Sequence, residues 1–227
     1  MKKLIYVSVL LISLTGFSQS SGSFSFSGTG NTLRTNRTHD GTWVTTRAED
    51  NSLIGSEYIY KTWQPKTSVY TVDGNKYVVS FMNFNARLNR FSASVSPVGQ
   101  DSVFIFNSSN ILKVKIKNKK FIKISNKFYE EIFAKEDFRL LKFYKASIKS
   151  APIDLMSQQK SGQDRIVVES SYFLEKESVK MFKVKTKTIL SLLEDKKTEV
   201  QAFIKSNRLS VKNENHLKRI FNYYNSL

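Results

Sequence analysis

Lysine recurs at every second position along one short segment, a pattern that suits the binding of polyanions. In residues 112–117, Leu112, Val114 and Ile116 alternate with lysines. Because successive side chains of a strand point to opposite faces, this alternation predicts a strand with one apolar face and one basic face. The same pattern is also typical of the ordinary solvated face of a strand, where lysine discourages edge-to-edge aggregation.

Further lysines extend this candidate site, both directly after the segment and later in the chain. If the strands that carry them are neighbours, they form one basic sheet face. That face would attract lipopolysaccharide phosphates, acidic polysaccharide, phospholipid headgroups or extracellular DNA. Phe121 is the only aromatic residue close to the lysines and is predicted to lie in the core, so the base stacking typical of nucleic-acid binding is not indicated. The candidate polyanion-binding residues are Lys113, Lys115, Lys117, Lys119, Lys120, Lys123, Lys183, Lys185 and Lys187.

Catalytic and metal-binding residue sets are hard to assemble from this chain. It has two histidines and no cysteine. His39 lies beside Asp40 in sequence, which is a poor geometry for orienting an imidazole in a triad, and His216 falls in a predicted helix. No zinc-ligand spacing and no calcium loop occurs. We therefore predict no catalytic residues, no metal and no cofactor.

Three acidic pairs have the residue types that a glycosidase would need. Each of them lies in lysine-rich surroundings at the end of a predicted element. The interpretation favoured by their surroundings is a solvated surface pair, because exposed carboxylates are far more common than buried ones. The pairs are Glu130–Glu131, Glu136–Asp137 and Glu194–Asp195.

The first 18 residues have the layout of a secretory signal peptide. Two lysines precede the apolar run Leu4–Leu14, and the small residues Gly16 and Ser18 follow at the spacing of a cleavage site. The run is shorter than the roughly 20 residues of a membrane span, and no later segment approaches one. We expect an exported chain with no transmembrane segment after cleavage, for which nucleic acid is a disfavoured partner.

Composition indicates a packed, basic, disulfide-free protein. The 227 residues are 40% hydrophobic and 13% aromatic, which is enough for a sizeable core. The net charge is +17, and most of the excess lies in residues 110–227. Without cysteine, an exported chain depends on packing alone for its stability. The partner is then expected to be an envelope protein or an anionic envelope polymer.

Short strands joined by tight turns dominate the pattern after residue 56. Residues 19–56 are rich in Ser, Gly, Thr and Asn and are predicted to be a flexible segment, with one strand at 42–45. From residue 57 to 186 we expect an antiparallel β-rich domain, with a hairpin turn at Asp73–Gly74. The predicted strands are 57–63, 68–72, 76–82, 90–96, 102–106, 112–117, 120–125, 138–149 and 166–174, and residues 150–164 are predicted to be a mobile loop.

Residues 187–227 change to a helical period. Leu217, Ile220, Phe221 and Tyr224 stand at i, i+3, i+4 and i+7, which predicts the buried stripe of a final helix. Asp195 is the expected N-cap of the preceding helix. Strands first and helices last predict the α+β class, as a β meander or curled sheet with C-terminal helices packed on it.

Residues 55–227 carry a resemblance. The segment Gly55–Trp63, followed by Asn83–Asn85 and much later by Leu192–Leu209 and Tyr223–Leu227, resembles a loose group of uncharacterised exported proteins of flavobacteria and related Bacteroidota. The resemblance implies export but no activity. Asp101-Ser102-Val103 also resembles the short O-glycosylation acceptor of such bacteria.

From these observations we expect a non-enzymatic exported envelope protein that acts as a binding or assembly subunit. The expected location is the periplasm or the periplasmic side of the outer membrane. The alternative is a polyanion-binding module that uses the lysine-rich sheet face.

Overall fold

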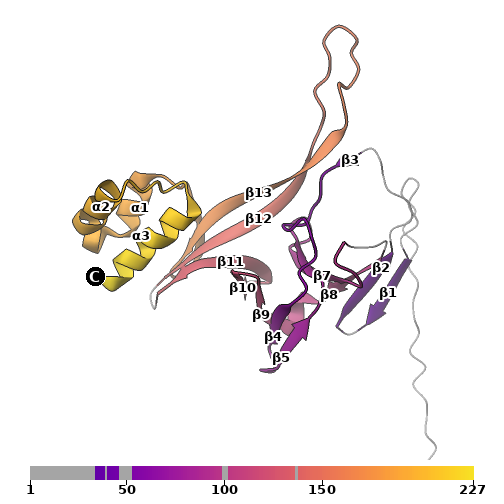
Figure 1. Ribbon diagram of the computed structural model, residues 1–227, viewed down its shortest axis with the longest axis horizontal. Helices are drawn as coiled ribbons and strands as arrows, with labels where there is room; N and C mark the ends of the chain where they lie inside the picture. The colour runs from indigo at the N-terminus through magenta and orange to yellow at the C-terminus, as the bar shows by residue number, and fades with distance from the viewer. Residues whose placement is uncertain (1–33, 39, 46–52, 99–101, 136–137) are drawn as a thin grey trace, which may run out of the picture.

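The computed structural model describes residues 34–38, 40–45, 53–98, 102–135 and 138–227. Within them the fold is α+β, with two open sheets followed by C-terminal helices (Figure 1). The smaller sheet has the spatial order β1 (Arg34–Thr38), β2 (Gly41–Thr45), β8 (Ser102–Phe106), β7 (Arg90–Ser94) and β6 (Met82–Asn85).

The larger sheet forms the body of the molecule. Its neighbouring strands are antiparallel, except that β3 (Leu53–Ile54) pairs in parallel with the start of β13. The remaining order is β14 (Val179–Phe182), β13 (Asp164–Glu175), β12 (Arg139–Lys149), β11 (Lys127–Ala134), β10 (Lys119–Ile124), β9 (Ile111–Ile116), β4 (Thr67–Thr71) and β5 (Lys76–Val79).

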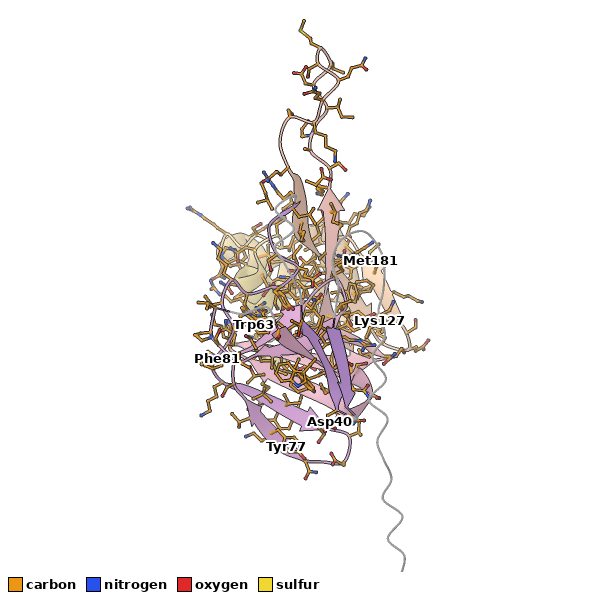
Figure 2. The ribbon with its side chains drawn as sticks, turned by 90° about the vertical axis from the view of Figure 1, so that its right-hand side faces the viewer. Asp40, Trp63, Tyr77, Phe81, Lys127 and Met181 are labelled. Atoms are coloured by element: carbon orange, nitrogen blue, oxygen red, sulfur yellow. The ribbon has the colours of Figure 1, made fainter. Side chains whose placement is uncertain are left out.

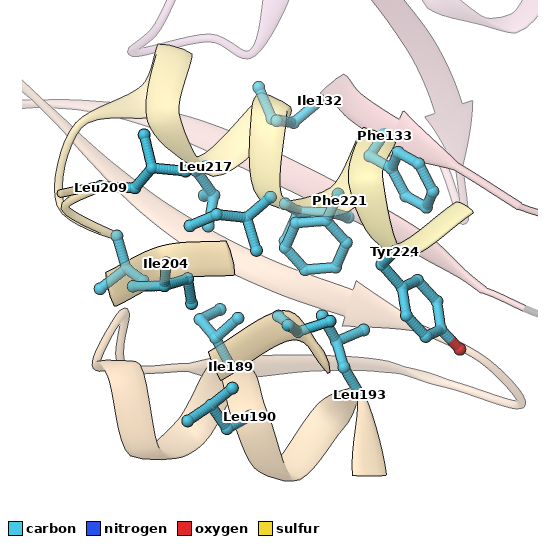
Figure 3. Packing of buried hydrophobic residues seen from close by; sticks show 14 of the residues in the cluster. Ile132, Phe133, Ile189, Leu190, Leu193, Ile204, Leu209, Leu217, Phe221 and Tyr224 are labelled. Atoms are coloured by element: carbon cyan, nitrogen blue, oxygen red, sulfur yellow. The ribbon is translucent and has the colours of Figure 1, made fainter. Parts of the chain in front are cut away.

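The helices follow β14 and gather at one end of the larger sheet. They are α1 (Thr186–Leu192), α2 (Lys197–Ser206) and α3 (Glu214–Ser226), with short 3-10 turns at Ser108–Asn110 and Glu194–Lys196. The predicted stripe is confirmed, because Leu217, Ile220, Phe221 and Tyr224 of α3 are all buried (Figure 3). No helix in the described part of the chain is long and apolar enough to span a membrane.

Two apolar cores lie on the same face of the larger sheet. One packs the helices against β11–β14, and the other packs β6 and β7 of the smaller sheet against β4, β9, β10 and β12. β12 takes part in both, since Leu140 belongs to the helical core while Tyr144 and Ala146 belong to the core between the sheets. The period of two along a strand places Lys142 on this same face, between the two cores.

Several predicted elements need correction, beginning with the N-terminal region. Residues 1–18 lie outside the described residues. The strand predicted at 42–45 is confirmed by β2, but the loop predicted around it is wrong for residues 34–38, which form β1. β1 pairs with β2 over five residues, and such backbone pairing needs no apolar alternation at a sheet edge.

The strand predicted at 57–63 is wrong. This segment only bridges to β6, through Tyr58 with Asn85 and Gln64 with Met82. Between those bridges the side chain of Asn83 takes the place of strand pairing: it accepts from the backbone N–H of Tyr60 at 3.2 Å and donates to its carbonyl at 2.8 Å.

The single strand predicted at 76–82 is two strands in two different sheets. The chain breaks between β5 and β6, where Phe81 has a φ of 51°, outside the strand region. The hairpin predicted before it is confirmed, with Gly74 at positive φ in the turn. Because of this break, β5 belongs to the larger sheet and β6 belongs to the smaller sheet.

Leu112 was predicted to face the core and is instead 52% exposed. The register between β4 and β9 shifts here, because Tyr70 opposes Lys113 while Thr71 opposes Ile111. Leu112 is the extra residue of this bulge, and Ile111 takes the buried position. The Asp195 N-cap is also wrong: no side chain caps α2, and the Asp195 carboxylate accepts from the Tyr224 hydroxyl at 3.1 Å.

Candidate functional site

A cluster of lysines surrounds one tyrosine on the outward face of the larger sheet. Tyr70 of β4 opposes Lys76 of β5 on one side and Lys113 of β9 on the other. The Nζ atoms of Lys113, Lys76 and Lys115 lie 4.4, 5.8 and 6.0 Å from the centre of the Tyr70 ring. These distances are within the range of cation–π attraction. We call these four residues the Tyr70 cluster.

The Tyr70 cluster carries concentrated positive charge. Within the described chain, none of its three lysines forms an ion pair with a carboxylate. Three cations within reach of one ring repel one another, and an anion placed over them would relieve that repulsion. The cluster can therefore attract phosphate, sulfate or carboxylate groups.

Only two of the nine predicted lysines belong to this cluster, Lys113 and Lys115. Lys117 lies in a turn, with its Nζ 5.4 Å from the ring centre of Tyr60. Lys123 donates to the backbone carbonyls of Ser108 and Ser109 at 2.7 and 2.8 Å. Both lysines are thus separate from the Tyr70 ring.

Lys183, Lys185 and Lys187 do not extend the basic face. They follow β14, and four strands separate β14 from β9 in the larger sheet. The strands that carry the two groups of lysines are therefore not neighbours, and the lysines do not form one continuous face. Lys76 is the member that the alternation at 112–117 does not reveal. The sequence feature that could have placed Lys76 beside Tyr70 is the Asp73–Gly74 turn, because a tight hairpin brings the residues on its two sides into register.

Lys119 is half-buried at a different site, where it meets a carboxylate and a phenol. Its Nζ donates to both carboxylate oxygens of Glu130 at 2.8 Å and to the Tyr144 hydroxyl at 2.9 Å. The Tyr144 hydroxyl donates to Glu130 Oε2 at 2.5 Å. Glu130 is only 1% exposed, so these contacts replace the water that its charge would otherwise require.

The same buried network continues to the helices. Lys142 of β12 pairs with Glu214, the first residue of α3, at 2.5 Å. The Tyr172 hydroxyl donates to the same carboxylate at 3.2 Å. Asn213 caps the helix by accepting from the backbone N–H groups of Asn215 and His216. A helix N-terminus favours an adjacent carboxylate, so these contacts join α3 to the sheet.

The expectation that Glu130–Glu131 is a solvated pair is wrong for Glu130. Consecutive residues of β11 point to opposite faces, so Glu130 enters the core side and Glu131 pairs with Lys120 on the other side. Glu194 and Asp195 lie in a 3-10 turn, and Glu136–Asp137 lies outside the described residues. Glu130 is buried, and its carboxylate is bound by Lys119 and Tyr144.

The electrostatics of this network raise the pKa of each of its tyrosines. Burial raises the pKa of Tyr144, and the negative charge and hydrogen bond of Glu130 raise it further. Burial also raises the pKa of Tyr172, with the charge of Glu214 adding to the effect. For Glu214 itself burial raises the pKa, but the hydrogen bond and charge of Lys142 outweigh this and leave it lowered.

A pocket of about 630 Å³ opens between the two sheets beside β5. Val69, Val79, Phe106 and Ile111 line it, with Tyr77 and other residues around them. Figure 2 shows Tyr77 and Asp40, another lining residue, at the same end of the molecule. The lining is mostly apolar, with polar residues such as Asp73 in it, and it suits a hydrophobic side chain.

The histidines join no such site in the described residues. His216 accepts through Nδ1 from the backbone N–H of Ser210 at 3.1 Å, which is a local contact at the start of α3. His39 lies outside the described residues. Within those that are described, no group of three or more His, Asp or Glu side chains is placed to hold a metal ion.

Comparison with known proteins returns no match: no family model, no curated protein and no solved structure is detectably similar to this chain.

The two neighbouring glutamates of β11 allow a matched test of burial. We expect Glu130→Ala to lower the free energy of unfolding by about 1–3 kcal/mol, because it leaves the buried Tyr144 hydroxyl and the half-buried Lys119 without their acceptor. Glu131→Ala removes a pair whose lysine is 39% exposed, against 21% for Lys119, and is expected to cost less than about 1 kcal/mol. Urea unfolding followed by tryptophan fluorescence measures the stability of both variants. Equal losses of stability would contradict the claim that only Glu130 has a structural role in the core.

The raised tyrosine pKa values predict instability at alkaline pH. The unfolded chain ionises tyrosine near its ordinary pKa of 10.0, while the folded chain keeps Tyr144 protonated. The free energy of unfolding should therefore be unaffected by this group below pH 10 and decline above it. Relative to the native protein, Tyr144→Phe should reduce the slope of the unfolding free energy against pH by the contribution of nearly one proton. Urea titrations at pH 9 to 11.5 give both slopes.

Proposed function

We propose that this chain is a non-enzymatic exported envelope protein that acts as a binding or assembly subunit. The signal-peptide layout of residues 1–18 supports export to the periplasm or the periplasmic side of the outer membrane. The observation that carries the binding role is the long hairpin of β12 and β13, whose end projects beyond the rest of the molecule (Figures 1 and 2).

Large apolar side chains occupy the end of this hairpin. Leu155 is 93% exposed and Met156 is 97% exposed, and the nearby Ile153 is also exposed. Burying each of them against a partner would release about 2 kcal/mol of hydrophobic free energy. Projection away from the body makes them accessible to a partner that need not contact either sheet. We call residues 150–163 the hairpin tip.

Hydrogen bonds within the hairpin tip keep these side chains pointing into solvent. The Asp154 carboxylate accepts from the backbone N–H groups of Met156 and Ser157 at 2.9 and 2.8 Å. The backbone N–H of Ser161 donates to the Pro152 carbonyl at 2.8 Å. Such a preformed turn loses little conformational entropy on binding, which favours a contact role.

The hairpin tip is tested by co-purification of a tagged native copy from solubilised envelopes. We expect a stoichiometric partner that survives a high-salt wash, because apolar contacts are not screened by salt. The double variant Leu155→Asp and Met156→Asp should lose it. The matched control, Gln158→Asp and Gln159→Asp, adds the same charge at the tip and should retain it. If both double variants recover the same amount of partner, the partner does not bind through Leu155 and Met156.

A polyanion-binding role is the second candidate, and the Tyr70 cluster favours it. Three lysines without carboxylate partners would release bound counterions when they contact an anionic polymer. The Tyr70 ring contributes a flat surface that holds the lysines together. This surface replaces the broader lysine face expected from the alternation of residues 112–117.

Inorganic polyphosphate is a suitable probe for this second candidate. Changing Lys76, Lys113 and Lys115 to Glu should reduce its affinity by at least tenfold at low salt, since three attractive charges become repulsive. The control changes Lys183, Lys185 and Lys187 to Glu, which alters the net charge equally at a distant place in the sheet. Isothermal titration measures both, and similar losses would mean that only the overall charge attracts the polymer.

A further inference from the structure

The strand β5 ends the larger sheet with an unpaired edge. One side pairs with β4, and within the described residues no strand pairs with the other side. The hairpin closes with Thr71 N–H donating to the Asn75 carbonyl at 3.0 Å. Because hydrogen-bonded and non-hydrogen-bonded pairs alternate along an antiparallel ladder, Tyr77 and Val79 bond to β4. The N–H and C=O groups of Lys76 and Val78 therefore point away from the sheet.

This edge is short and carries one lysine, but it has no proline and no bulge to protect it. Tyr77 is 52% exposed and Val78 is 58% exposed, and no proline interrupts the strand. Lys76 is the single charged residue of β5. An open row of backbone donors and acceptors with apolar side chains is a template for another strand.

The two faces beside the edge differ in chemistry. On the inner face, Tyr77 and Val79 border the pocket of about 630 Å³, which is also lined by Phe106 and Ile111. On the outer face, Lys76 and Val78 stand next to any added strand, and Lys113 of the Tyr70 cluster lies beyond Lys76. Side chains of an added strand would point alternately to these two faces.

We propose that β5 is a docking edge for an extended segment of a protein partner that is apolar at alternate positions and acidic at the positions between. The backbone of that segment would bond to Lys76 and Val78, its apolar side chains would enter the pocket, and its acidic side chains would meet the lysines. Strand addition of this kind obtains affinity from the main chain and specificity from pockets for alternate side chains.

A second copy of this chain fits the edge less well. Antiparallel pairing of two β5 strands would add another Lys76 to a surface that already holds three lysines without carboxylate partners in the described chain. Like charges across a strand pair are destabilising. The inference is also independent of the hairpin tip, which lies at the other end of the molecule from Tyr77 (Figure 2).

The test uses the full-length processed protein and a short fluorescein-labelled peptide that alternates glutamate and valine. Fluorescence anisotropy should show saturable binding. Val78→Pro removes the outward N–H while leaving the bonds of β5 to β4, so it should weaken binding at least tenfold, the equivalent of about 1.4 kcal/mol. Val78→Thr keeps the N–H and the side-chain shape and should bind within about twofold of the native protein.

Two further peptides make the result independent of how well a variant folds. A peptide with every residue N-methylated cannot form the backbone bonds to Lys76 and Val78 in either strand direction and should not bind. A peptide of the same composition, with all glutamates before all valines, should bind at least tenfold more weakly. Equal binding of this block peptide would overturn the proposal, because charge alone would then explain the affinity. No binding of the alternating peptide, or concentration-dependent dimers that Val78→Pro abolishes, would also overturn it. None of these outcomes bears on the hairpin tip, whose own variants should bind the peptide normally.

Discussion

The buried contact among Lys119, Glu130 and Tyr144 is the interaction on which the arrangement of this protein depends. It lies where two apolar cores meet on one face of the larger sheet, so the helices and the smaller sheet are both positioned relative to it. A charge in this place is tolerable only when its partners satisfy it fully. That requirement sets the register of β10, β11 and β12 against one another.

The lysines of the molecule differ in whether a carboxylate partner satisfies their charge. Lysines that have carboxylate partners, such as Lys119 and Lys142, hold the fold together. Three lysines that lack them in the described chain, Lys76, Lys113 and Lys115, surround Tyr70 next to the edge of β5. The apolar side chains also fall into two groups. Those of the cores are buried, whereas Leu155 and Met156 are exposed at the hairpin tip. The surfaces that we propose for binding thus lie away from the packed cores.

Local patterns predicted the elements well where one face is buried and the other is solvated. The stripe from Leu217 to Tyr224 and the strand from Arg90 to Ser94 are examples. Prediction was wrong where a single residue interrupts the period, as at the bulge of Leu112 and the turn at Phe81. It was also wrong for Glu130, since a carboxylate beside lysines in sequence has the same local pattern whether its partner is buried or exposed.

The amino-acid sequence by itself determined the α+β class, the order of strands before helices, the excess of basic charge and the layout of an export signal. These properties depend on residue periodicity and composition, which are local. The tertiary structure alone decided which lysines share a surface, which carboxylate is buried and which strand edge stays open. Those properties depend on strand order and register, and these are set by contacts between residues far apart in the chain.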